Sequence, residues 1–418
     1  MNTVLVIGWE YLKNRRRQTV LSIVGVMLGV SFFIGIASMM KGMHDYFIEK
    51  LIDVAPHVKI MDEFRNPQQQ PVYQRFPDAA VELRGIKPRE EIRGIHSARS
   101  ILERLTAMDG LAVSPVLQGQ VFLRYGGKDV AAALTGIRPE MERHASNLER
   151  DMTQGDLNAL LTNSNGIIIG EELAHKLGAR LGAKISAISP AGNTRTMKLV
   201  GLFNTGVTEV DGSTGYAMLK KVQILQDREN RINQINIRLQ NVDDATSLAA
   251  DLEKRYGYRT ESWQETFANI FEMFVIENII MYSTVGVIII VSSFGIFNII
   301  STSVNEKSRD IAILKSIGFS EGDIRKVFLF QGIVIGLIGS IFGWVLGAML
   351  VEMLASFRID LGEEVNMPIK FEGMPVFRSV WLYIGGAVMA TLSSVISAYI
   401  PARKAAALYP VDIIRGAA

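Results

Sequence analysis

Cysteine is absent from this chain of 418 residues. Its absence excludes disulfide bonds, thiolate metal sites and cysteine nucleophiles together. The cellular compartment stays open, since an oxidising space does not require disulfides. The chain also lacks a large excess of charge of either sign, since its formal net charge is only +2. A strong electrostatic attraction to nucleic acid is therefore not indicated.

Motifs for catalysis and nucleotide binding are absent as well. The chain has no G-x-x-x-x-G-K-[ST] phosphate loop, because its one Gly-Lys step, Gly127-Lys128, lacks a glycine five residues before it. It has neither a G-x-S-x-G nucleophile elbow nor an H-E-x-x-H motif. We therefore predict no enzyme, no ATP hydrolysis by this chain alone and no metal site. The histidines lack ligand spacing and are predicted to be surface or interface residues: His44, His57, His96, His144 and His175.

What the chain does have is four apolar runs, each long enough for the ~20 residues of helix that span a bilayer. They are Thr19–Met40, Ile279–Ser301, Val327–Leu354 and Ser379–Ile400. The first is predicted to be an uncleaved span, because it exceeds the apolar core of a signal peptide and Ala37-Ser38-Met39 is not a cleavage site. No Lys, Arg or Asp lies inside any run, and Glu352 lies at the outer end of the third. Their absence argues against ion channels, proton pumps and ion-coupled carriers.

Basic residues in the short segments predict the orientation. The N-terminal tail holds four Lys or Arg, residues 302–326 five and residues 402–418 three, whereas 355–378 balances three against four acidic residues. This bias places both termini and the central loop in the cytoplasm, with Arg15–Arg17 as a topology anchor. The predicted fold is an α-helical membrane protein with four transmembrane helices and a mixed α/β external domain between the first two.

The predicted domain boundaries follow from these runs. They are 1–18, cytoplasmic segment; 19–55, first span and stalk; 56–263, α/β domain; 264–301, stalk and second span; 302–326, cytoplasmic helix; 327–354, third span; 355–378, external loop; 379–401, fourth span; and 402–418, cytoplasmic tail.

Alternating apolar residues and turn signals predict the elements of the external domain. Predicted strands are 58–61, 121–125, 130–137, 166–170, 185–189, 196–203 and 232–239. Predicted helices are 89–108, 171–177 and 243–256, the last capped by Asp243 or Asp244. The first stalk should end at Pro56, and 264–277 should form a second stalk that runs straight into the second span.

Small residues predict where the spans pack against one another. In the first span, Gly25 and Gly29 form a G-x-x-x-G pair. In the third span, glycine recurs every three or four residues and predicts one smooth face: Gly332, Gly336, Gly339, Gly343 and Gly347.

Charges crowd together in residues 302–326, between the second and third spans. This segment predicts a short amphipathic helix that stops at Gly318. Two interpretations of it stay open. In one, the chain is a subunit that transmits force from a motor; in the other, it is a membrane-anchored structural protein or receptor, and the charges are a solvated face.

Two stretches carry a resemblance to a known family: NEKSRDIAILKSIGFSEGDIRKVFLFQG with the glycine face that follows, and the ending PARKAAALYPVDIIRG. They resemble the permease domain shared by FtsX, MacB and the lipoprotein-releasing LolC/LolE proteins. The order of one span, a large external domain and three spans also matches, so the resemblance covers nearly the whole chain. The external segments GIIIGEELAHKLGARLGAKISAISP and MKLVGLFNTGVTEVDGSTGYAML, and the stalk segment ESWQETFANIFEMFVIENIIMYS, favour the LolC/LolE branch.

The resemblance implies a permease of a type VII (mechanotransmission) ABC transporter in the bacterial inner membrane, with a MacB/LolC-like periplasmic domain. Two permeases, identical or related, would pair, and each would dock on a separate ATPase that binds ATP and Mg. ATP binding would drive the stalks together without cargo crossing the bilayer. The resemblance assigns contact with the ATPase to Glu306, Lys307, Arg309, Asp310, Leu314, Lys315 and Gly318.

In the lipoprotein-releasing branch, acyl chains enter a cavity between the first two spans of the paired subunits. The matching positions here are Phe32, Ile36, Met39, Met43, Phe47, Ile279, Ile280 and Tyr282. The alternative is that these residues face lipid or pack ordinarily. One departure concerns the turn at Pro190–Thr196, which is short where LolC-type subunits carry an arm that captures a periplasmic carrier. The chain would then be LolE-like, or a relative that does not use that carrier; MacB-like export with a periplasmic adaptor and FtsX-like signalling are the alternatives.

Overall fold

The computed structural model describes residues 3–63, 94–357 and 373–409. The chain divides into two compact units. The first, which we call the helical unit, comprises 1–46, 272–360 and 371–418; the second, the α/β unit, comprises 47–271 and 361–370. Each is described below by itself.

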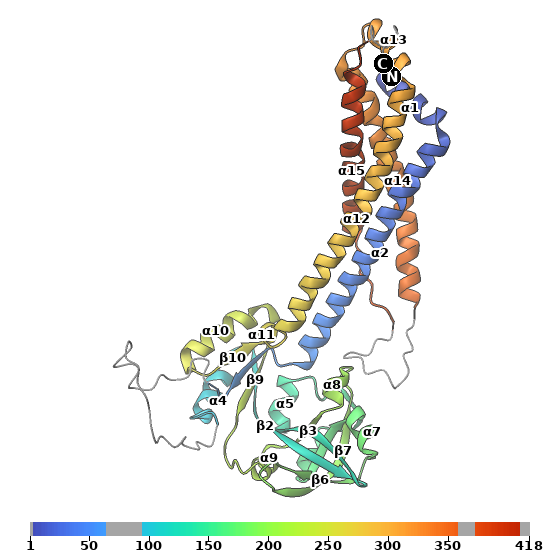
Figure 1. Cartoon of the computed structure of the whole chain (residues 1–418). Helices are drawn as coiled ribbons and strands as arrows, with labels where there is room; N and C mark the ends of the chain where they lie inside the picture. The colour runs from blue at the N-terminus through green and yellow to red at the C-terminus, as the bar shows by residue number, and fades with distance from the viewer. Residues whose placement is uncertain (1–2, 64–93, 358–372, 410–418) are drawn as a thin grey trace, which may run out of the picture. The chain divides into compact units, whose positions relative to one another are not determined.

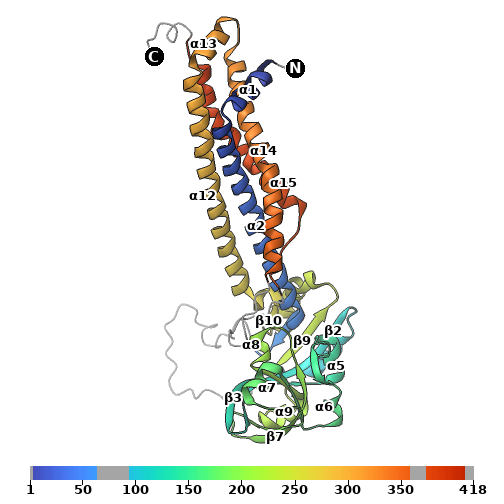
Figure 2. The same cartoon turned by 90° about the vertical axis from the view of Figure 1, so that its right-hand side faces the viewer.

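Long helices dominate the helical unit (Figure 1). Its helices are α1 (Thr3–Asn14), α2 (Arg16–Val54), α12 (Ala268–Glu306), α13 (Ser308–Ser316), α14 (Glu321–Ser356) and α15 (Val380–Ala406), of which α2 and α12 continue into the α/β unit. Within the described residues, α2, α12, α14 and α15 are long and apolar enough to cross a membrane. The four predicted spans therefore lie in four continuous helices, which run alongside one another within this unit (Figures 1 and 2).

The glycines of α14 pack against two neighbouring helices. A Cβ added to Gly332 would lie 2.9 Å from the Cβ of Ala398 on α15, and one added to Gly343 would lie 2.7 Å from the Cβ of Val30 on α2. Real side chains do not approach so closely, so these positions require glycine unless a helix moves. The predicted stripe thus divides: Gly332 and Gly336 face α15, whereas Gly339, Gly343 and Gly347 face α2.

The pair Gly25 and Gly29 lies toward α12 rather than α14, and its role in close helix packing stays a prediction. Among the described residues, no neighbouring atom lies within 4 Å of a Cβ added to Gly25, and the nearest neighbour of one at Gly29 is Ile288 Cγ2 of α12 at an ordinary 3.5 Å. The physical reason is rotation by one residue: α2 presents Val26 and Val30, not the glycines, to the smooth face of α14. The carbonyl of Gly25 instead accepts a hydrogen bond of 3.1 Å from Ser292 Oγ on α12.

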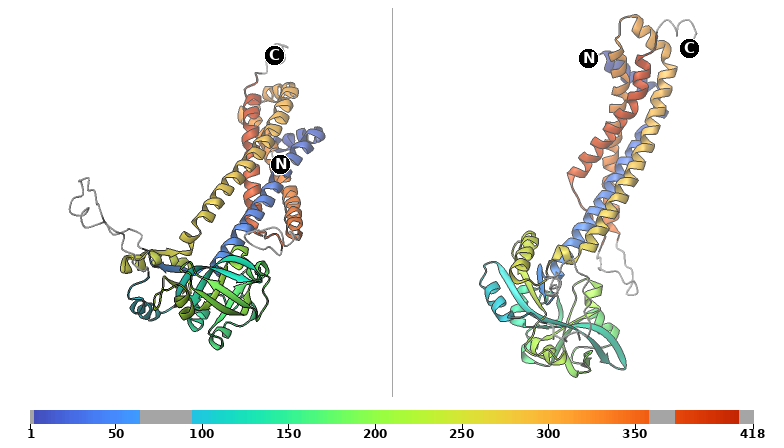
Figure 3. Two further views of the ribbon diagram at one scale, coloured as in Figure 1. Left: turned by 60° about the horizontal axis from the view of Figure 1, so that its bottom comes forward. Right: turned by 60° about the vertical axis from the view of Figure 1, so that its left-hand side comes forward.

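Within the described residues, the α/β unit contains one sheet of ten strands with short helices around it (Figure 3). The strands are β1 (Val58–Met61), β2 (Leu111–Tyr125), β3 (Lys128–Ile137), β4 (Met152–Gly155), β5 (Gly166–Gly170), β6 (Lys184–Ile188), β7 (Thr194–Phe203), β8 (Thr214–Met218), β9 (Gln234–Leu239) and β10 (Thr260–Ser262). The helices are α4 (Ala98–Thr106), α5 (Pro139–Ala145), α6 (Ala159–Thr162), α7 (Glu171–Leu177), α8 (Thr208–Asp211), α9 (Leu219–Leu225), the 3₁₀ turn η1 (Val242–Asp244), α10 (Ala245–Tyr256) and α11 (Trp263–Thr266).

The long strand β2 joins the two halves of this sheet. The strand order is β10-β1-β9-β2-β3-β8-β5-β7-β4, and β6 pairs with both β2 and β7. Strands β3 and β8, and β5 and β7, pair in parallel, while the other pairs are antiparallel. Apolar residues with no exposed surface, such as Leu123, Leu134 and Ile235, form the core over which the helices pack.

The two hairpins predicted from their turn residues are present in the structure. Strands β2 and β3 turn through Gly126 and Gly127, whose φ angles of 56° and 80° suit glycine in a two-residue hairpin loop. Strand β5 and helix α7 have the predicted bounds, and α7 stops at Gly178 with φ 71°.

Two predicted helices differ from the structure. The helix predicted over 89–108 falls partly outside the described residues; within them it begins only at Ala98, because the backbone N–H of Ile95 pairs instead with the carbonyl of Ile232. The helix predicted from Asp243 begins at Ala245, after the 3₁₀ turn η1, and its N-cap residue is Asp244, one of the two predicted caps, although the Asp244 side chain makes no capping hydrogen bond. The turn η1 has its own cap, Asn241, whose side chain accepts a hydrogen bond from the N–H of Asp243.

The two predicted stalks can be compared with the helices that contain them. Helix α2 ends at Val54, two residues before Pro56, as predicted. The second stalk runs without a break into the second span from Ala268 onward, as predicted, because α12 is one continuous helix. The first residues of the predicted stalk differ, since they belong to the separate helix α11, which ends at Thr266, and Phe267 lies outside helical geometry.

A buried carboxyl in the α/β unit predicts pH-dependent stability. Glu142 is 2% exposed and accepts a hydrogen bond of 2.5 Å from Ser114 Oγ. Burial raises its pKa above the ordinary 4.5, although the bonds from Ser114 and Ser146 act in the opposite direction. The unfolded chain then loses this proton before the folded chain does, so the stability that the neutral acid contributes is present below pH 4.5 and is lost as pH rises through the folded pKa.

We expect Glu142→Gln to flatten the dependence of the unfolding free energy on pH above 4.5. Urea unfolding of the full chain in detergent, followed at several pH values between about 4 and 8, measures this. Exposed Glu140→Gln, in the same helix, is the matched control. If the unfolding free energy of the two variants depends on pH with the same slope, the pH dependence does not come from Glu142.

Candidate functional site

Helix α13 is held against the helical unit by the charged residues at its start. Lys307, its N-cap residue, pairs with Asp310 at 2.9 Å and lies over the ring of Tyr11 on α1, 5.5 Å from the centroid. Burial, and then the nearby Asp310 carboxylate, raise the pKa of Tyr11 to about 12. Its hydroxyl therefore stays neutral near pH 7. Glu306, the last residue of α12, forms an ion pair with Arg15 between α1 and α2.

Lys315 holds the other end of α13. Its Nζ donates hydrogen bonds of 2.8 Å and 2.9 Å to the carbonyls of Ala406 and Leu408, where α15 ends. Cations stabilise helix C-termini because the last carbonyls lack partners within the helix. The side chain of Lys315 is only 12% exposed, so this residue ties α13 to α15.

Backbone geometry fixes where α13 stops. The N–H of Phe319 bonds to the carbonyl of Leu314 and that of Gly318 to Lys315, which together form a Schellman motif. Gly318 has φ 106°, a conformation that favours glycine. Helix α14 then starts with a capping box between Ser320 and Asp323. The two helices thus meet at a short, defined turn.

The outer face of α13 combines a cation with exposed apolar side chains. Arg309 is exposed and has no ion-pair partner among the residues that the structure describes. Ile313 and Ile317 follow at four-residue steps and are 50% and 70% exposed. We call Arg309, Ile313 and Ile317 the outer row. The outer row thus joins one exposed cation to two exposed apolar side chains.

The structure therefore sorts the residues predicted to contact an ATPase. Lys307, Leu314 and Lys315 are partly buried and seat the helix, Asp310 pairs with Lys307, Glu306 pairs with Arg15, and Gly318 ends the helix. Of the charged residues in this set, Arg309 is the one that is exposed without an ion-pair partner among the described residues. The predicted set did not include Ile313 and Ile317, whose spacing of four from Arg309 puts them on the same face.

A second feature is an apolar cavity of about 290 Å³ between α2 and α12. It brings together four of the predicted cargo residues, Ile36, Met39, Met43 and Ile280. The other four do not line it: Phe32, Phe47, Ile279 and Tyr282. Side chains that the prediction missed complete the wall: Met40, Glu277, Met281 and Thr284.

The carboxylate of Glu277 is a charged group in the wall of this cavity, and the sequence analysis did not predict it there. Its carboxylate lies 3.0 Å from Nε2 of His44, a buried side chain on α2 whose ring stacks on Phe274 at 4.0 Å. These contacts join α2 and α12 beside the methionines.

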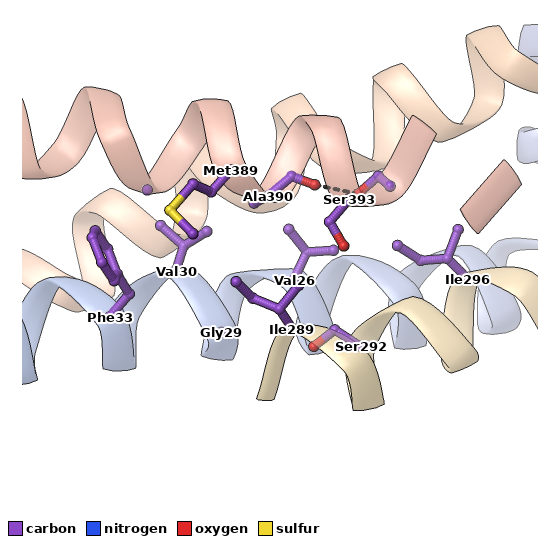
Figure 4. Close-up of a pocket in the computed structure, with 12 residues that line it drawn as sticks. Val26, Gly29, Val30, Phe33, Ile289, Ser292, Ile296, Met389, Ala390 and Ser393 are labelled. Atoms are coloured by element: carbon purple, nitrogen blue, oxygen red, sulfur yellow. Dashed lines mark hydrogen bonds between the residues drawn. The ribbon is translucent and has the colours of Figure 1, made fainter. Parts of the chain in front are cut away.

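A smaller cavity lies deeper, between α2, α12 and α15 (Figure 4). Val26, Val30, Phe33 and Met389 point into it. Ser393 also lines it and shares a hydrogen bond of 2.5 Å with Ser293 of α12. Its volume of about 20 Å³ is roughly what one water needs. It is too small for cargo, so the cavity at the methionines is the better candidate.

Comparisons with known proteins agree over most of the chain. Residues 19–255 match the family model of the MacB-like periplasmic core domain, and residues 282–410 match that of the FtsX-like permease C-terminal region. LolC, a lipoprotein-releasing system transmembrane protein of Neisseria meningitidis, is 27% identical over 362 residues, covering 82% of this chain and 81% of the relative.

Other relatives are more distant or less defined. LolE, a lipoprotein-releasing system transmembrane protein of Haemophilus influenzae, is 22% identical over 442 residues, covering 99% of each chain. The uncharacterized ABC transporter permease YknZ of Bacillus subtilis is 24% identical over 426 residues, covering 96% of this chain and 95% of the relative.

Proposed function

This chain belongs to the family of ABC transporter permeases with a MacB-like periplasmic core and an FtsX-like C-terminal region, and on that premise we propose that it is a mechanotransmission subunit of a type VII transporter. It is an integral protein of the inner membrane. We place both termini and α13 in the cytoplasm and the α/β unit in the periplasm. A separate ATPase binds ATP and Mg, and a second permease, identical or related, completes the pair.

The observation that carries this proposal is the seating of α13. Its inner face is tied to α1 through Lys307 and to the end of α15 through Lys315, while the outer row stays open. A push on the outer row would therefore reach several helices at once. Close packing of α14 on α2 and α15 makes the relay stiff, which rigid-body coupling requires.

The proposed cargo is a lipoprotein or a lipid-like amphiphile. The cavity between α2 and α12 has four methionines, and their flexible side chains suit acyl chains of varied shape. Helices α2 and α12 of this chain line the cavity, and the second permease would complete it. The lipoprotein-releasing names of the LolC and LolE relatives support this cargo class.

Crosslinking tests the cargo. Photoactivatable residues at Met39 and Met43 should capture lipidated protein in the reconstituted complex, because both line the cavity. Tyr282, exposed in the single chain, should capture it only when two permeases pair. The control is Ile341, an exposed apolar residue of α14, which should capture phospholipid alone. Capture of small amphiphiles without lipidated protein at Met39 and Met43 would overturn the cargo assignment.

A second candidate function rests on the turn between β6 and β7. The turn closes through a hydrogen bond of 2.9 Å from the N–H of Ser189 to the carbonyl of Asn193, with Gly192 at φ 83°. It leaves no room for an arm that captures a periplasmic carrier. The chain is then LolE-like, or it drives MacB-like export with a periplasmic adaptor; an FtsX-like signalling role would move no cargo. The crosslinking experiment separates these outcomes.

A further inference from the structure

A basic cleft lies where α1 meets α2 and α12 meets α13. It has a volume of about 810 Å³, within the usual range of ligand sites. Its charged lining comprises five cations and one carboxylate: Lys13, Arg15, Arg16, Arg17, Lys307 and Glu306. The cleft thus carries a strong positive charge in a chain whose net charge is only +2.

The cations of the basic cleft fall into two groups. Arg15 is engaged by Glu306 and donates a hydrogen bond of 2.7 Å to Gln18, and Lys307 is engaged by Asp310 and Tyr11. The other three are exposed, and among the described residues they have no acidic partner: Lys13, Arg16 and Arg17. Such a group attracts an anion from outside the chain.

An exposed apolar row on α1 adjoins this charge. Leu5, Val6 and Trp9 are 40–53% exposed and lie on one side of the helix, and Lys13 follows Trp9 by four residues. The opposite side is buried, because Gly8 packs against Phe330 of α14. A helix with exposed apolar residues, a tryptophan and a terminal lysine is typical of one that lies in the membrane interface.

We propose that the basic cleft binds the phosphate of an anionic phospholipid headgroup, while Leu5, Val6 and Trp9 lie among the acyl chains. Basic pockets between transmembrane helices on the cytoplasmic side bind such headgroups. A role as a topology anchor requires only that the arginines lie on the cytoplasmic side. It does not explain why they line a cleft next to a helix with exposed apolar residues. The apolar row favours a lipid over a free phosphate or nucleotide, which would gain nothing from it.

The position of the cleft links lipid binding to α13. A bound phosphate would compete with Glu306 for Arg15 and with Asp310 for Lys307, the pairs that seat this helix. Anionic lipid would thereby tune the coupling of the ATPase. This consequence rests on the proposed function, whereas the binding itself does not.

Native mass spectrometry of the full chain in detergent, titrated with phosphatidylglycerol or with phosphatidylcholine of the same acyl chains, tests the binding. We expect a preference for phosphatidylglycerol, and Arg16→Gln with Arg17→Gln should weaken it about 25-fold, since each basic residue near an anionic surface contributes roughly fivefold. The matched control is Arg403→Gln with Lys404→Gln, two exposed cations at the end of α15, which should leave the preference unchanged. Equal losses in the two pairs would overturn the site.

Two further variants and two soluble anions separate the possible sources of the effect. Arg16→Lys with Arg17→Lys keeps the charge and should keep most of the preference, which guards against misfolding of the glutamine pair. Trp9→Ser should weaken both lipids alike. Inorganic phosphate or ATP should fail to displace phosphatidylglycerol; displacement at equal affinity would make this a site for soluble anions and overturn the lipid assignment. Binding without any effect of phosphatidylglycerol on ATPase turnover would refute only the link to α13.

Discussion

Replacing Arg309 with glutamate should lower the turnover of the ATPase in the reconstituted complex at least tenfold, while the chain stays folded and inserted. Arg309 lies open on the outer row and has no acidic partner among the described residues, so its reversal removes nothing that holds the permease together. A reversed charge at a docked interface costs about 2 kcal/mol or more, which is more than tenfold in binding. Turnover and co-purification of the ATPase measure the effect.

Two controls define what this result means. Arg403→Glu reverses an exposed cation at the end of α15 and should leave turnover unchanged. Glu306→Arg, in contrast, places a second cation against Arg15 and tests the seating of α13 rather than docking. Unchanged turnover in the Arg309 variant would show that the outer row is a solvated face, and the force-transmitting function would fail with it.

The end of α13 could be predicted from the sequence, whereas its start and its orientation could not. A local signal sets the end, Gly318 in a left-handed conformation, but the helix begins only at Ser308, because Glu306 still belongs to α12. Which charges face inward depends on residues far away in the chain. Lys307 meets Tyr11, nearly 300 positions earlier, and Lys315 meets the carbonyl of Ala406, 91 positions later. The sequence alone does not distinguish a lysine that binds the C-terminus of a distant helix from one that is exposed and available to a partner protein.

The same division holds for the α/β unit. Hairpins such as β2–β3 follow from adjacent residues and a Gly-Gly turn, so they were predicted. Strands β4, β8 and β10 were missed, because each is short and forms only through pairing with distant strands. The helix predicted to begin before Ala98 failed for the same reason, since the pairing of Ile95 with Ile232 overrides the local periodicity. Local propensity is a weak guide where a non-local hydrogen bond competes.

The glycines of the membrane helices offer a sharper contrast, because the structure separates packed ones from open ones. A methyl group at Gly343 would meet Val30 at 2.7 Å and the carbonyl of Met27 at 3.1 Å, whereas one at Gly295 of α12 would have no neighbour within 4 Å. Alanine favours a helix over glycine by about 1 kcal/mol at either position. Any difference between the two substitutions therefore reports packing.

We expect Gly343→Ala to destabilise the chain by about 1–3 kcal/mol, the usual cost of overpacking a close contact, despite the gain in helix propensity. Gly295→Ala should leave stability unchanged or raise it by up to about 1 kcal/mol. Unfolding in mixed micelles with increasing sodium dodecyl sulfate, followed by circular dichroism, measures both. Gly343→Ala should also lower coupled ATPase turnover, because α14 would move away from α2 and the relay would loosen. If the two variants unfold alike, the contact between α14 and α2 is not close, and the stiffness on which force transmission depends must come from elsewhere in the helical unit.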